Sequence, residues 1–380
     1  MKIPLHQYQS KALESKNNLL VLAGTGGGKT HLGVVWLIKQ ISENPEGLFL
    51  VVGYSDDYID SELFPLVYST LQQLGLVQHK KRNNITLISG GHIIFKSAQS
   101  QIITFKPVAI WCDEVCQYPF RAWYSIIERS AMWGARILLT GTPGKRWVQR
   151  EIVDRWRKGE LVNWEVISFP SYVNPKFPSD IENLRRILPA EEFARRIMGQ
   201  YTKPLGAVFT EFTNDNIYPK KVYDKPAFGG IDPGTNFAVV EVVVRNDEFI
   251  VTNTWLDVRG TTSERAAKLT PGVPYYCDPS ASSVILDLQS LGINVKAAPR
   301  KEWLYSVNKI NELFKRGLLY IARAQYEFID EIENYSYRQS PQGEWMDEPV
   351  KVDDHRVDAL RYAILGYLEH PKVLPTVYIE

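Results

Sequence analysis

The sequence predicts a two-domain α/β protein, in which a parallel sheet covered by helices is joined by a linker to a second α/β unit. Over residues 1–170, short β-branched apolar runs alternate with longer helical or polar stretches, the pattern of a parallel sheet. Five prolines then lie near each other, and after Gly206 the strands become longer and more antiparallel in character. We therefore expect domains at 1–170 and 206–380, joined by a helical, proline-rich linker at 171–205.

The composition is that of a globular protein. Hydrophobic residues make up 44% and charged residues 23% of the 380 positions, which excludes a disordered chain. Lys and Arg outnumber Asp and Glu by only 44 to 43, so any contact with a polyanion must come from local patches. The three cysteines show no zinc-type pairing and are interpreted as buried thiols in a reducing compartment. Since the amino terminus has no signal-peptide core and no apolar run approaches about 18 residues, we expect a cytoplasmic protein.

The first domain is expected to contain a strand in each of six apolar runs, at 19–24, 48–54, 92–97, 108–114, 136–143 and 163–169. Two short helical pieces, 179–188 and 190–200, are predicted within the linker.

The second domain is expected to open with a strand at 228–234 and a hairpin at 236–258, with its turn at Asn246 and Asp247. Further strands are predicted at 273–280 and 293–299, and helices at 301–316, 324–335 and 354–368.

The stretch LAGTGGGKTH points to phosphate binding. From Ala23 to Thr30 it meets the G-x-x-x-x-G-K-[ST] fingerprint, except that Ala23 replaces the first glycine. It follows an apolar strand and opens an amphipathic helix, where backbone N–H groups can face an anion. We expect Lys29 to neutralise the β- and γ-phosphates of ATP and Thr30 to bind Mg²⁺. The glycines expected to lie against the phosphates are Gly26, Gly27 and Gly28.

Further ATP-site candidates follow from the strands around this loop. VAIWCDE places Asp113 at a strand end, where it would hold the Mg²⁺ shell, and Glu114 beside it, where it would polarise the attacking water. The hydroxyl groups of ILLTGTPG could respond to the γ-phosphate, although an ordinary turn explains them equally well; the coupling candidates are Thr140, Gly141 and Thr142. The amide of Gln9 could pair with adenine or could simply lie on the surface.

These residues resemble the RecA-like ATPase core shared by superfamily 2 helicases and viral DNA-packaging motors. A helicase motor would carry a second such lobe, and no second phosphate-loop series follows residue 205. Efficient hydrolysis therefore implies an arginine from a neighbouring subunit and a homo-oligomeric ring. The sequence does not choose among the candidates Arg121, Arg129, Arg136 and Arg146.

The second domain carries a set of carboxylates on separate elements. Asp232 follows a short apolar strand in GGIDPGTNFA, Asp278 follows VPYYC, and Asp358 lies on the last helix, with Asp354 one turn earlier on the same face. Such a set could hold two Mg²⁺ or Mn²⁺ ions roughly 3.5–4 Å apart for phosphodiester cleavage. Each aspartate alone could instead be a turn residue or a helix cap.

The order of these aspartates resembles the RNase H-like nucleases. GIDPGT looks like the first-strand motif of the Holliday-junction resolvases in that superfamily, and H-x-x-D-A-L looks like their last-helix motif. The resemblance implies that Asp232, Asp278 and Asp358 are catalytic metal ligands.

The order of a P-loop ATPase, a linker and an RNase H-like nuclease resembles the large subunit of tailed-bacteriophage terminases. In the linker, Asn-Pro introduces two helices, and Gly-x-Val-Phe opens the nuclease, as in that family. The resemblance implies ATP-driven packaging of double-stranded DNA and cutting of concatemers. It also implies a small terminase subunit, the portal and the prohead as partners, and a place in the host cytoplasm, transiently at the capsid portal and outside the mature virion.

Two other functions remain open from the sequence. The chain could be a stand-alone resolvase-like nuclease with a regulatory ATP site, or a helicase or remodelling ATPase whose C-terminal domain is not catalytic. DNA would be held through its phosphates in each case. Candidate basic contacts are Lys145, Arg146, Arg150, Lys296, Arg300 and Lys301.

Overall fold

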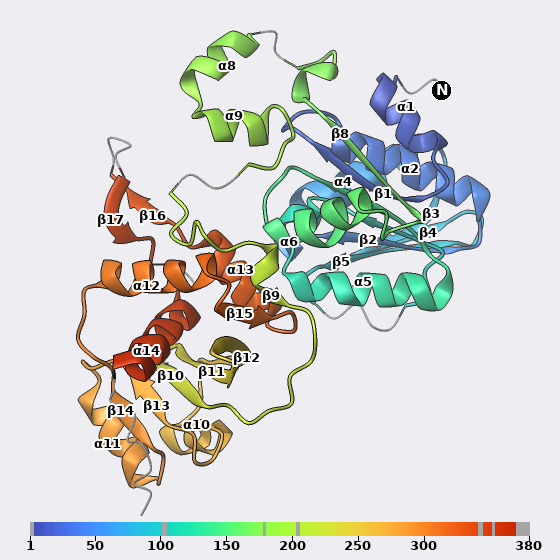
Figure 1. Ribbon diagram of the computed structural model, residues 1–380. Coiled ribbons are helices and arrows are strands. Elements are labelled where there is room, and N and C mark those ends of the chain that lie inside the picture. Colours follow the sequence, from blue (N-terminus) through green and yellow to red (C-terminus); the bar gives the residue numbers. More distant parts are fainter. Residues whose placement is uncertain are drawn as a thin grey trace, which may run out of the picture. The chain divides into compact units, whose positions relative to one another are not determined.

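The computed structural model describes residues 4–100, 105–177, 180–202, 206–340, 345–351 and 354–369 (Figure 1). The chain divides into two compact units, Met1–Lys203 and Pro204–Glu380, and each is described by itself. Within the described residues, no helix is both long enough and apolar enough to span a bilayer.

The first unit is built on an eight-stranded sheet with the order β3-β4-β5-β2-β6-β7-β1-β8. From β5 to β8 all neighbouring strands are parallel, while β3 and β4 form an antiparallel extension. The strands are β1 (Asn18–Ala23), β2 (Leu48–Gly53), β3 (Val77–Lys81), β4 (Asn84–Leu87), β5 (His92–Ser97), β6 (Ala109–Cys112), β7 (Arg136–Gly141) and β8 (Trp164–Phe169). The six strands expected in this region are confirmed, and the β3–β4 hairpin is an addition.

Helices connect the strands of this sheet, and the longer ones pack on it through their buried apolar residues. They are α1 (Gln7–Glu14), α2 (Lys29–Glu43), α3 (Asp56–Tyr58), α4 (Phe64–Gln73), α5 (Phe120–Trp133), α6 (Arg146–Val148) and α7 (Arg155–Arg157), with π-helical turns at Ile59–Leu63 and Gln149–Asp154. The two predicted linker helices are present as α8 (Ile181–Ile187) and α9 (Ala190–Arg196), and both belong to the first unit.

The second unit contains a seven-stranded sheet with the order β14-β13-β10-β11-β12-β15-β9. Strands β10 to β12 form an antiparallel meander, and β13 and β14 continue beside β10 in parallel. This arrangement is the RNase H-like fold that the carboxylate order predicted. The strands are β9 (Ile217–Tyr218), β10 (Phe228–Pro233), β11 (Phe237–Arg245), β12 (Glu248–Asp257), β13 (Tyr275–Cys277), β14 (Val295–Ala297) and β15 (Leu319–Ala322).

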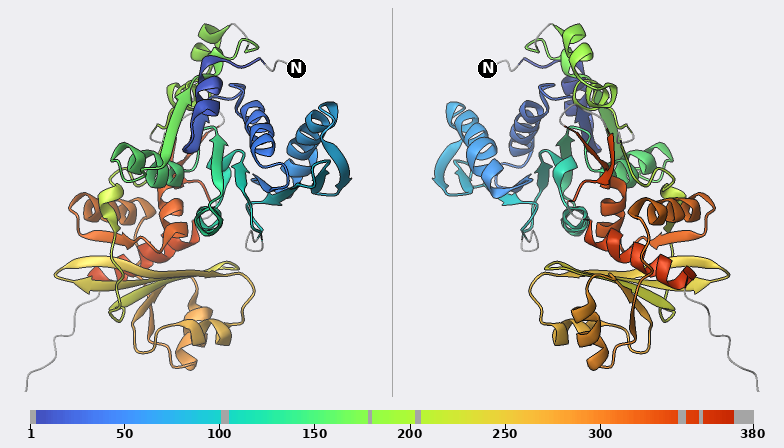
Figure 2. Two further views of the ribbon diagram at one scale, coloured as in Figure 1. Left: turned by 90° about the vertical axis from the view of Figure 1, so that its right-hand side faces the viewer. Right: turned by 90° about the vertical axis from the view of Figure 1, so that its left-hand side faces the viewer.

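Helices cover both faces of this sheet (Figure 2). One apolar cluster joins the β10–β12 meander to α12 (Trp303–Lys315), α13 (Tyr326–Asn334) and α14 (His355–Glu369). A second cluster joins the other face to α10 (Thr262–Lys268) and α11 (Ser282–Ser290). A separate hairpin consists of β16 (Tyr337–Gln339) and β17 (Trp345–Pro349). The turn predicted at Asn246 and Asp247 is confirmed, since both have positive φ between β11 and β12.

Two candidate active sites

The glycine-rich segment forms a turn from β1 into α2. Gly26 and Gly28 have φ of 75° and 88°, in the left-handed region that favours glycine. Gly28 is the N-cap of α2, so the turn leads into a helix N-terminus, whose partial positive charge attracts an anion. The first turn of α2, which the structure describes in full, holds no acidic side chain. The segment therefore has the local form of a phosphate-binding loop.

Lys29, the first residue of α2, lies inside the site. Its side chain is only 5% exposed, and its Nζ donates to the carbonyl oxygen of Gly24 at 3.1 Å. The same nitrogen lies 3.8 Å from Oε1 of Glu114. The ammonium group is therefore held between the loop and the carboxylate that was predicted to act on water.

Asp113 connects the end of β6 with β7 and with helix α2. It is fully buried at the end of β6, its Oδ2 accepts from Oγ1 of Thr30 at 2.9 Å, and its Oδ1 accepts from Oγ1 of Thr140 at 2.6 Å. This convergence is possible because β7 lies between β1 and β6, and parallel strands end at the same edge. The predicted metal-shell residues and the predicted coupling residue are thus directly hydrogen-bonded.

Glu114 has an unusual backbone. Its φ of 53° lies in the left-handed region, which non-glycine residues adopt mainly at turns and functional sites. Its Oε2 accepts from the backbone N–H of Thr142 at 3.3 Å. Burial raises the pKa of the Glu114 carboxyl, and the nearby Lys29 ammonium partly offsets this rise. A carboxylate with a raised pKa is better suited to accept a proton from water than an ordinary one.

Gln9 has protein partners in the structure. Its Nε2 donates to the carbonyl oxygen of Gly28 at 2.8 Å, and its Oε1 accepts from the backbone N–H of His6 at 3.0 Å. The side chain is therefore engaged with the phosphate loop, and its pairing with adenine stays a prediction. Gly27 and Gly141 contribute only backbone; Gly141 packs against Cys116.

Sequence reasoning missed Tyr58. Its hydroxyl donates to Oδ2 of Asp113 at 2.7 Å, beside Thr30. Burial and the adjacent Asp113 raise the pKa of the Tyr58 hydroxyl, so it stays a donor. No local motif predicts this contact, because 55 positions separate Tyr58 from Asp113.

The structure distinguishes the candidate arginines. Arg129 is buried beside Glu128, and Arg136 and Arg146 donate to backbone carbonyl oxygens. Arg121, at the start of α5, is exposed.

Among the candidate DNA contacts, Arg150 is excluded by its burial. Its side chain is 6% exposed and pairs with Glu151 at 3.2 Å, so it does not face DNA. Lys301 pairs with Glu369 at 3.3 Å, while Lys296 and Arg300 are exposed.

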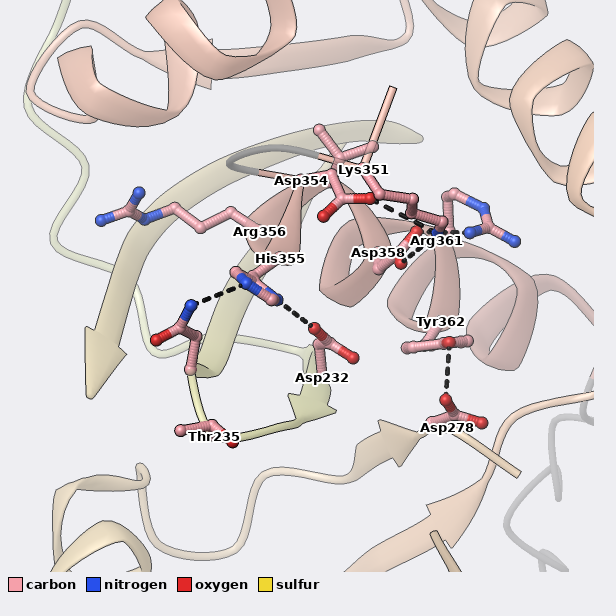
Figure 3. Close-up of polar contacts among 12 residues, drawn as sticks. Asp232, Thr235, Asp278, Lys351, Asp354, His355, Arg356, Asp358, Arg361 and Tyr362 are labelled. Atoms are coloured by element: carbon pink, nitrogen blue, oxygen red, sulfur yellow. Dashed lines mark hydrogen bonds and ion pairs between the residues drawn. The ribbon is translucent and has the colours of Figure 1, made fainter. Parts of the chain in front are cut away.

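The second site lies at the end of β10, where the strand meets α14. A Cβ on Gly230 would lie 1.9 Å from the carbonyl oxygen of Ala359, so only glycine allows this approach. The close contact brings Asp232 on β10 near Asp358 on α14, with Asp278 at the end of β13 on the same side (Figure 3). The sequence had predicted this set from separate elements.

Asp232 is held by a histidine that lies in the H-x-x-D stretch. Nδ1 of His355 lies 3.0 Å from Oδ2 of Asp232, and its Nε2 lies 2.9 Å from Nδ2 of Asn236. Since an amide nitrogen only donates, this network assigns the proton to Nδ1. Burial, with the charges of Asp358 and Asp278, raises the pKa of Asp232 to about 6, although His355 opposes the shift.

The other two carboxylates also have fixed partners. Oδ2 of Asp278 accepts from the hydroxyl of Tyr362 at 3.0 Å, and its Oδ1 accepts from Ser280. Asp358 accepts a hydrogen bond from the buried Arg361. The spacing along α14 could have suggested Arg361 as the partner of Asp358, because it lies one turn later. It could not have suggested the contact of Tyr362 with Asp278, which spans 84 positions.

The donor set fits a divalent cation, although the arrangement would have to tighten around it. Among the described residues, no three His, Cys, Asp or Glu side chains are already grouped as metal ligands. Oδ2 of Asp354 is buried and has no hydrogen-bond partner in the described part of the chain. The ammonium of Lys351 lies 3.4 Å from this oxygen and 3.7 Å from Oδ2 of Asp358 (Figure 3). The positive charge of this side chain therefore already pairs with both carboxylates. Carboxylate oxygens are the ligands that Mg²⁺ and Mn²⁺ prefer.

Comparison with known proteins was made on sequence and on structure. Residues 20–215 match the family model described as "Terminase large subunit, T4likevirus-type, N-terminal". No curated protein sequence matches the chain.

Among solved structures, the large terminase of a thermophilic bacteriophage is 18% identical, with 96% of this chain and 99% of that chain covered and a TM-score of 0.48. The ATPase domain of the Thermus phage P74-26 large terminase is 16% identical, covering 52% and 94%, with a TM-score of 0.46. The Mn-bound nuclease domain of the bacteriophage SPP1 large terminase is 19% identical, covering 39% and 95%, with a TM-score of 0.32.

Proposed function

The chain belongs to the family of terminase large subunits, and on that premise we propose that it translocates double-stranded DNA into a prohead with ATP and cuts concatemeric DNA at a metal-dependent site. One observation carries the proposal. The two units each hold a buried or half-buried carboxylate centre of different chemistry, one against a phosphate loop and one at the end of a meander strand.

In the first unit, Lys29 would contact the β- and γ-phosphates of ATP, and Thr30 and Asp113 would hold the Mg²⁺ shell. Glu114 would orient the attacking water and accept its proton, which its raised pKa favours. Thr140 donates a hydrogen bond to Asp113, and the backbone N–H of Thr142 donates one to Glu114. Loss of the γ-phosphate on hydrolysis would therefore act, through these two carboxylates, on the end of β7.

In the second unit, Asp232, Asp278 and Asp358 would supply the oxygen ligands, with Asp354 as a further one. A bound pair of Mg²⁺ or Mn²⁺ ions supplies an activated water and stabilises the leaving oxygen of the phosphodiester. His355 orients Asp232 through its Nδ1–H, and Tyr362 orients Asp278 through its hydroxyl.

One surface of the first unit fits the phosphates of DNA. The strand register places His79, Thr86 and His92 in one row and Lys81 in the next. Lys96 lies on the same face, since it is separated from His92 by an even number of positions along β5. Strands β3, β4 and β5 contain no Asp or Glu, so nothing on these strands neutralises the face. A sequence-independent motor needs such phosphate contacts.

The proposed DNA face predicts a charge-dependent loss. The double substitution Lys81→Glu and Lys96→Glu should weaken duplex DNA binding at least about tenfold at 100 mM salt, because it replaces two phosphate contacts with repulsion. Lys16→Glu, a matched charge reversal on an exposed lysine outside these strands, is the control. Equal DNA affinity of the double variant and the control would remove this face from the proposal.

We also propose a ring of copies acting with a small terminase subunit, the portal and the prohead. The support for the ring is that the described part of the first unit carries one phosphate loop on one mostly parallel sheet, with no second lobe to close on the nucleotide. Arg121, exposed on α5, is the candidate we would test first for completing a neighbour's ATP site.

Motor activity can be tested on DNA that is not cut. Full-length Asp232→Asn protein should displace a triplex-forming oligonucleotide from duplex DNA with ATP and not with a non-hydrolysable analogue. Asp232→Asn combined with Glu114→Gln should displace none. A protein that hydrolyses ATP but never displaces the oligonucleotide would indicate the alternative of a nuclease with a regulatory ATP site.

A further inference from the structure

We propose that Ser171 and Asn174 are positioning residues of the ATP site, which hold the phosphate loop from outside and link its conformation to helix α9. The inference rests on the proposed ATPase function of this loop. It concerns the segment after β8, to which neither the motif nor the family resemblance assigns a role at the nucleotide.

The two side chains bind consecutive carbonyl groups of the loop. Oγ of Ser171 donates to the carbonyl oxygen of Thr25 at 2.7 Å, and Nδ2 of Asn174 donates to that of Gly26 at 2.7 Å. Ser171 is fully buried. From the other side, the side chains of His6 and Gln9 contact the next two carbonyl oxygens at 3.2 and 2.8 Å.

Such contacts orient the amides that would face phosphate. In a trans peptide the C=O and the following N–H point in opposite directions. Holding the carbonyl of Thr25 toward Ser171 therefore turns the N–H of Gly26 away from this segment. Asn174 does the same for the N–H of Gly27, which in this structure donates to the carbonyl oxygen of Gly24 at 3.1 Å. A phosphate loop binds through converging N–H groups, so outward-held carbonyls preorganise it.

The same contacts reach the end of α9. The backbone N–H of Thr25 donates to the carbonyl oxygen of Arg196 at 2.6 Å, and the N–H of Ser171 donates to that of Ile197 at 2.7 Å. A Cβ on Gly24 would lie 2.2 Å from Oγ of Ser171 and 2.4 Å from the Ile197 carbonyl oxygen. The loop and the end of α9 are thus in direct contact, which explains a glycine at a position that phosphate binding alone does not demand.

A loop that shifts on binding a nucleotide would consequently strain or release the contact with residues 196–197. Asn174 and Ser171 would transmit that change, because their side chains join the loop to the segment that leads into α8 and α9.

The experiment uses the full-length protein and a fluorescent ATP analogue. Asn174→Asp keeps the size of the side chain but replaces the donor with an acceptor that repels the Gly26 carbonyl. It should weaken nucleotide binding about tenfold, with an unchanged melting temperature in the absence of nucleotide. Asn183→Asp, the same chemical change at an exposed position of α8, should bind like the wild type.

Hydrogen exchange tests the link to α9. In the wild type, a non-hydrolysable ATP analogue should slow exchange in residues 190–199 as well as in the loop, and Asn174→Asp should protect the loop alone at saturating analogue. Ser171→Ala should also protect the loop alone at saturating analogue. If Ser171→Ala does not fold, the test rests on the exchange pattern of Asn174→Asp.

The proposal is overturned if Asn174→Asp binds the analogue like the wild type, or if bound analogue protects the loop of the wild type but leaves residues 190–199 unchanged. A wild-type protein that does not bind ATP would instead overturn the proposed ATPase function itself.

Discussion

At the scale of single residues, both sites are made of contacts across long sequence distances. The sequence predicts the residues that carry a motif: Lys29, Thr30, Asp113 and Asp232 each stand next to glycine, strand or turn signals. It does not predict the side chains that orient them, such as Tyr58, because a hydrogen bond over 55 positions leaves no local pattern. The tertiary fold alone brings such partners together.

Glu114 gives the most direct prediction for the ATP site. Glu114→Gln keeps the size of the side chain but removes the proton acceptor, so the rate of ATP hydrolysis should fall at least about a hundredfold. Binding of the fluorescent analogue should change little, because the loop and Lys29 are intact. A variant that still hydrolyses ATP at near the wild-type rate would show that another group activates the water.

Lys351 predicts a gain of metal affinity. Its ammonium competes with a cation for Asp354 and Asp358, so Lys351→Met should bind Mn²⁺ about three- to tenfold more tightly, a modest gain because the lysine side chain is 66% exposed. Electron paramagnetic resonance of free Mn²⁺ gives the affinity. Lys315→Met, on an exposed residue of α12, is the control, and equal affinities of the two variants would refute the competition.

Asp232 predicts a proton linkage for metal binding. Its pKa is raised from 3.8 to about 6, so at pH 5.5 most of the carboxyl is protonated and at pH 7.5 it is ionised. Mn²⁺ binding should therefore release roughly three-quarters of a proton at pH 5.5 and almost none at pH 7.5, and the affinity should rise with pH and level off above the pKa of about 6. Calorimetry in buffers of different ionisation enthalpy counts these protons. The same proton count at both pH values would contradict the raised pKa.

At the scale of elements, most apolar strands were predictable and polar ones were not, although the short apolar strand β15 was also missed. The six parallel strands of the first unit were found from β-branched apolar runs, since four of them are buried on both faces and β5 and β8 each keep a buried apolar face. The β3–β4 hairpin was missed because β3, VQHKK, leaves four of its five side chains exposed. The hairpin β16–β17 was missed for the same reason.

The packing of α14 on β10 predicts a stability effect. A Cβ on Gly230 would collide with the backbone of Ala359, which cannot move without shifting α14. Gly230→Ala should therefore lower the free energy of unfolding of the second unit by about 1–3 kcal/mol or more, measured by denaturant titration. Gly234→Ala serves as the comparison, because its added Cβ would come no nearer than 3.6 Å to another atom and its φ lies outside the left-handed region. An unchanged stability of Gly230→Ala would mean that α14 can withdraw from β10 at little cost.

At the scale of the whole molecule, one chain holds two candidate sites of different chemistry in two compact units. The phosphate loop and the β6 carboxylates belong to residues 1–203, and the carboxylates of the RNase H-like sheet belong to residues 204–380. The order of motifs predicted this organisation, because each motif lies at a strand end within its own sheet. Since the two sites share no residue, a substitution that abolishes the activity of one site should leave the activity of the other intact.

Parallel assays of ATP hydrolysis and of supercoiled plasmid cleavage with Mg²⁺ or Mn²⁺ test this central claim most directly. We predict that Asp232→Asn loses cleavage and keeps ATP hydrolysis, while Glu114→Gln loses ATP hydrolysis and keeps cleavage. The account would be contradicted by a wild type that does not cut, by cleavage that survives Asp232→Asn, or by either substitution abolishing both activities.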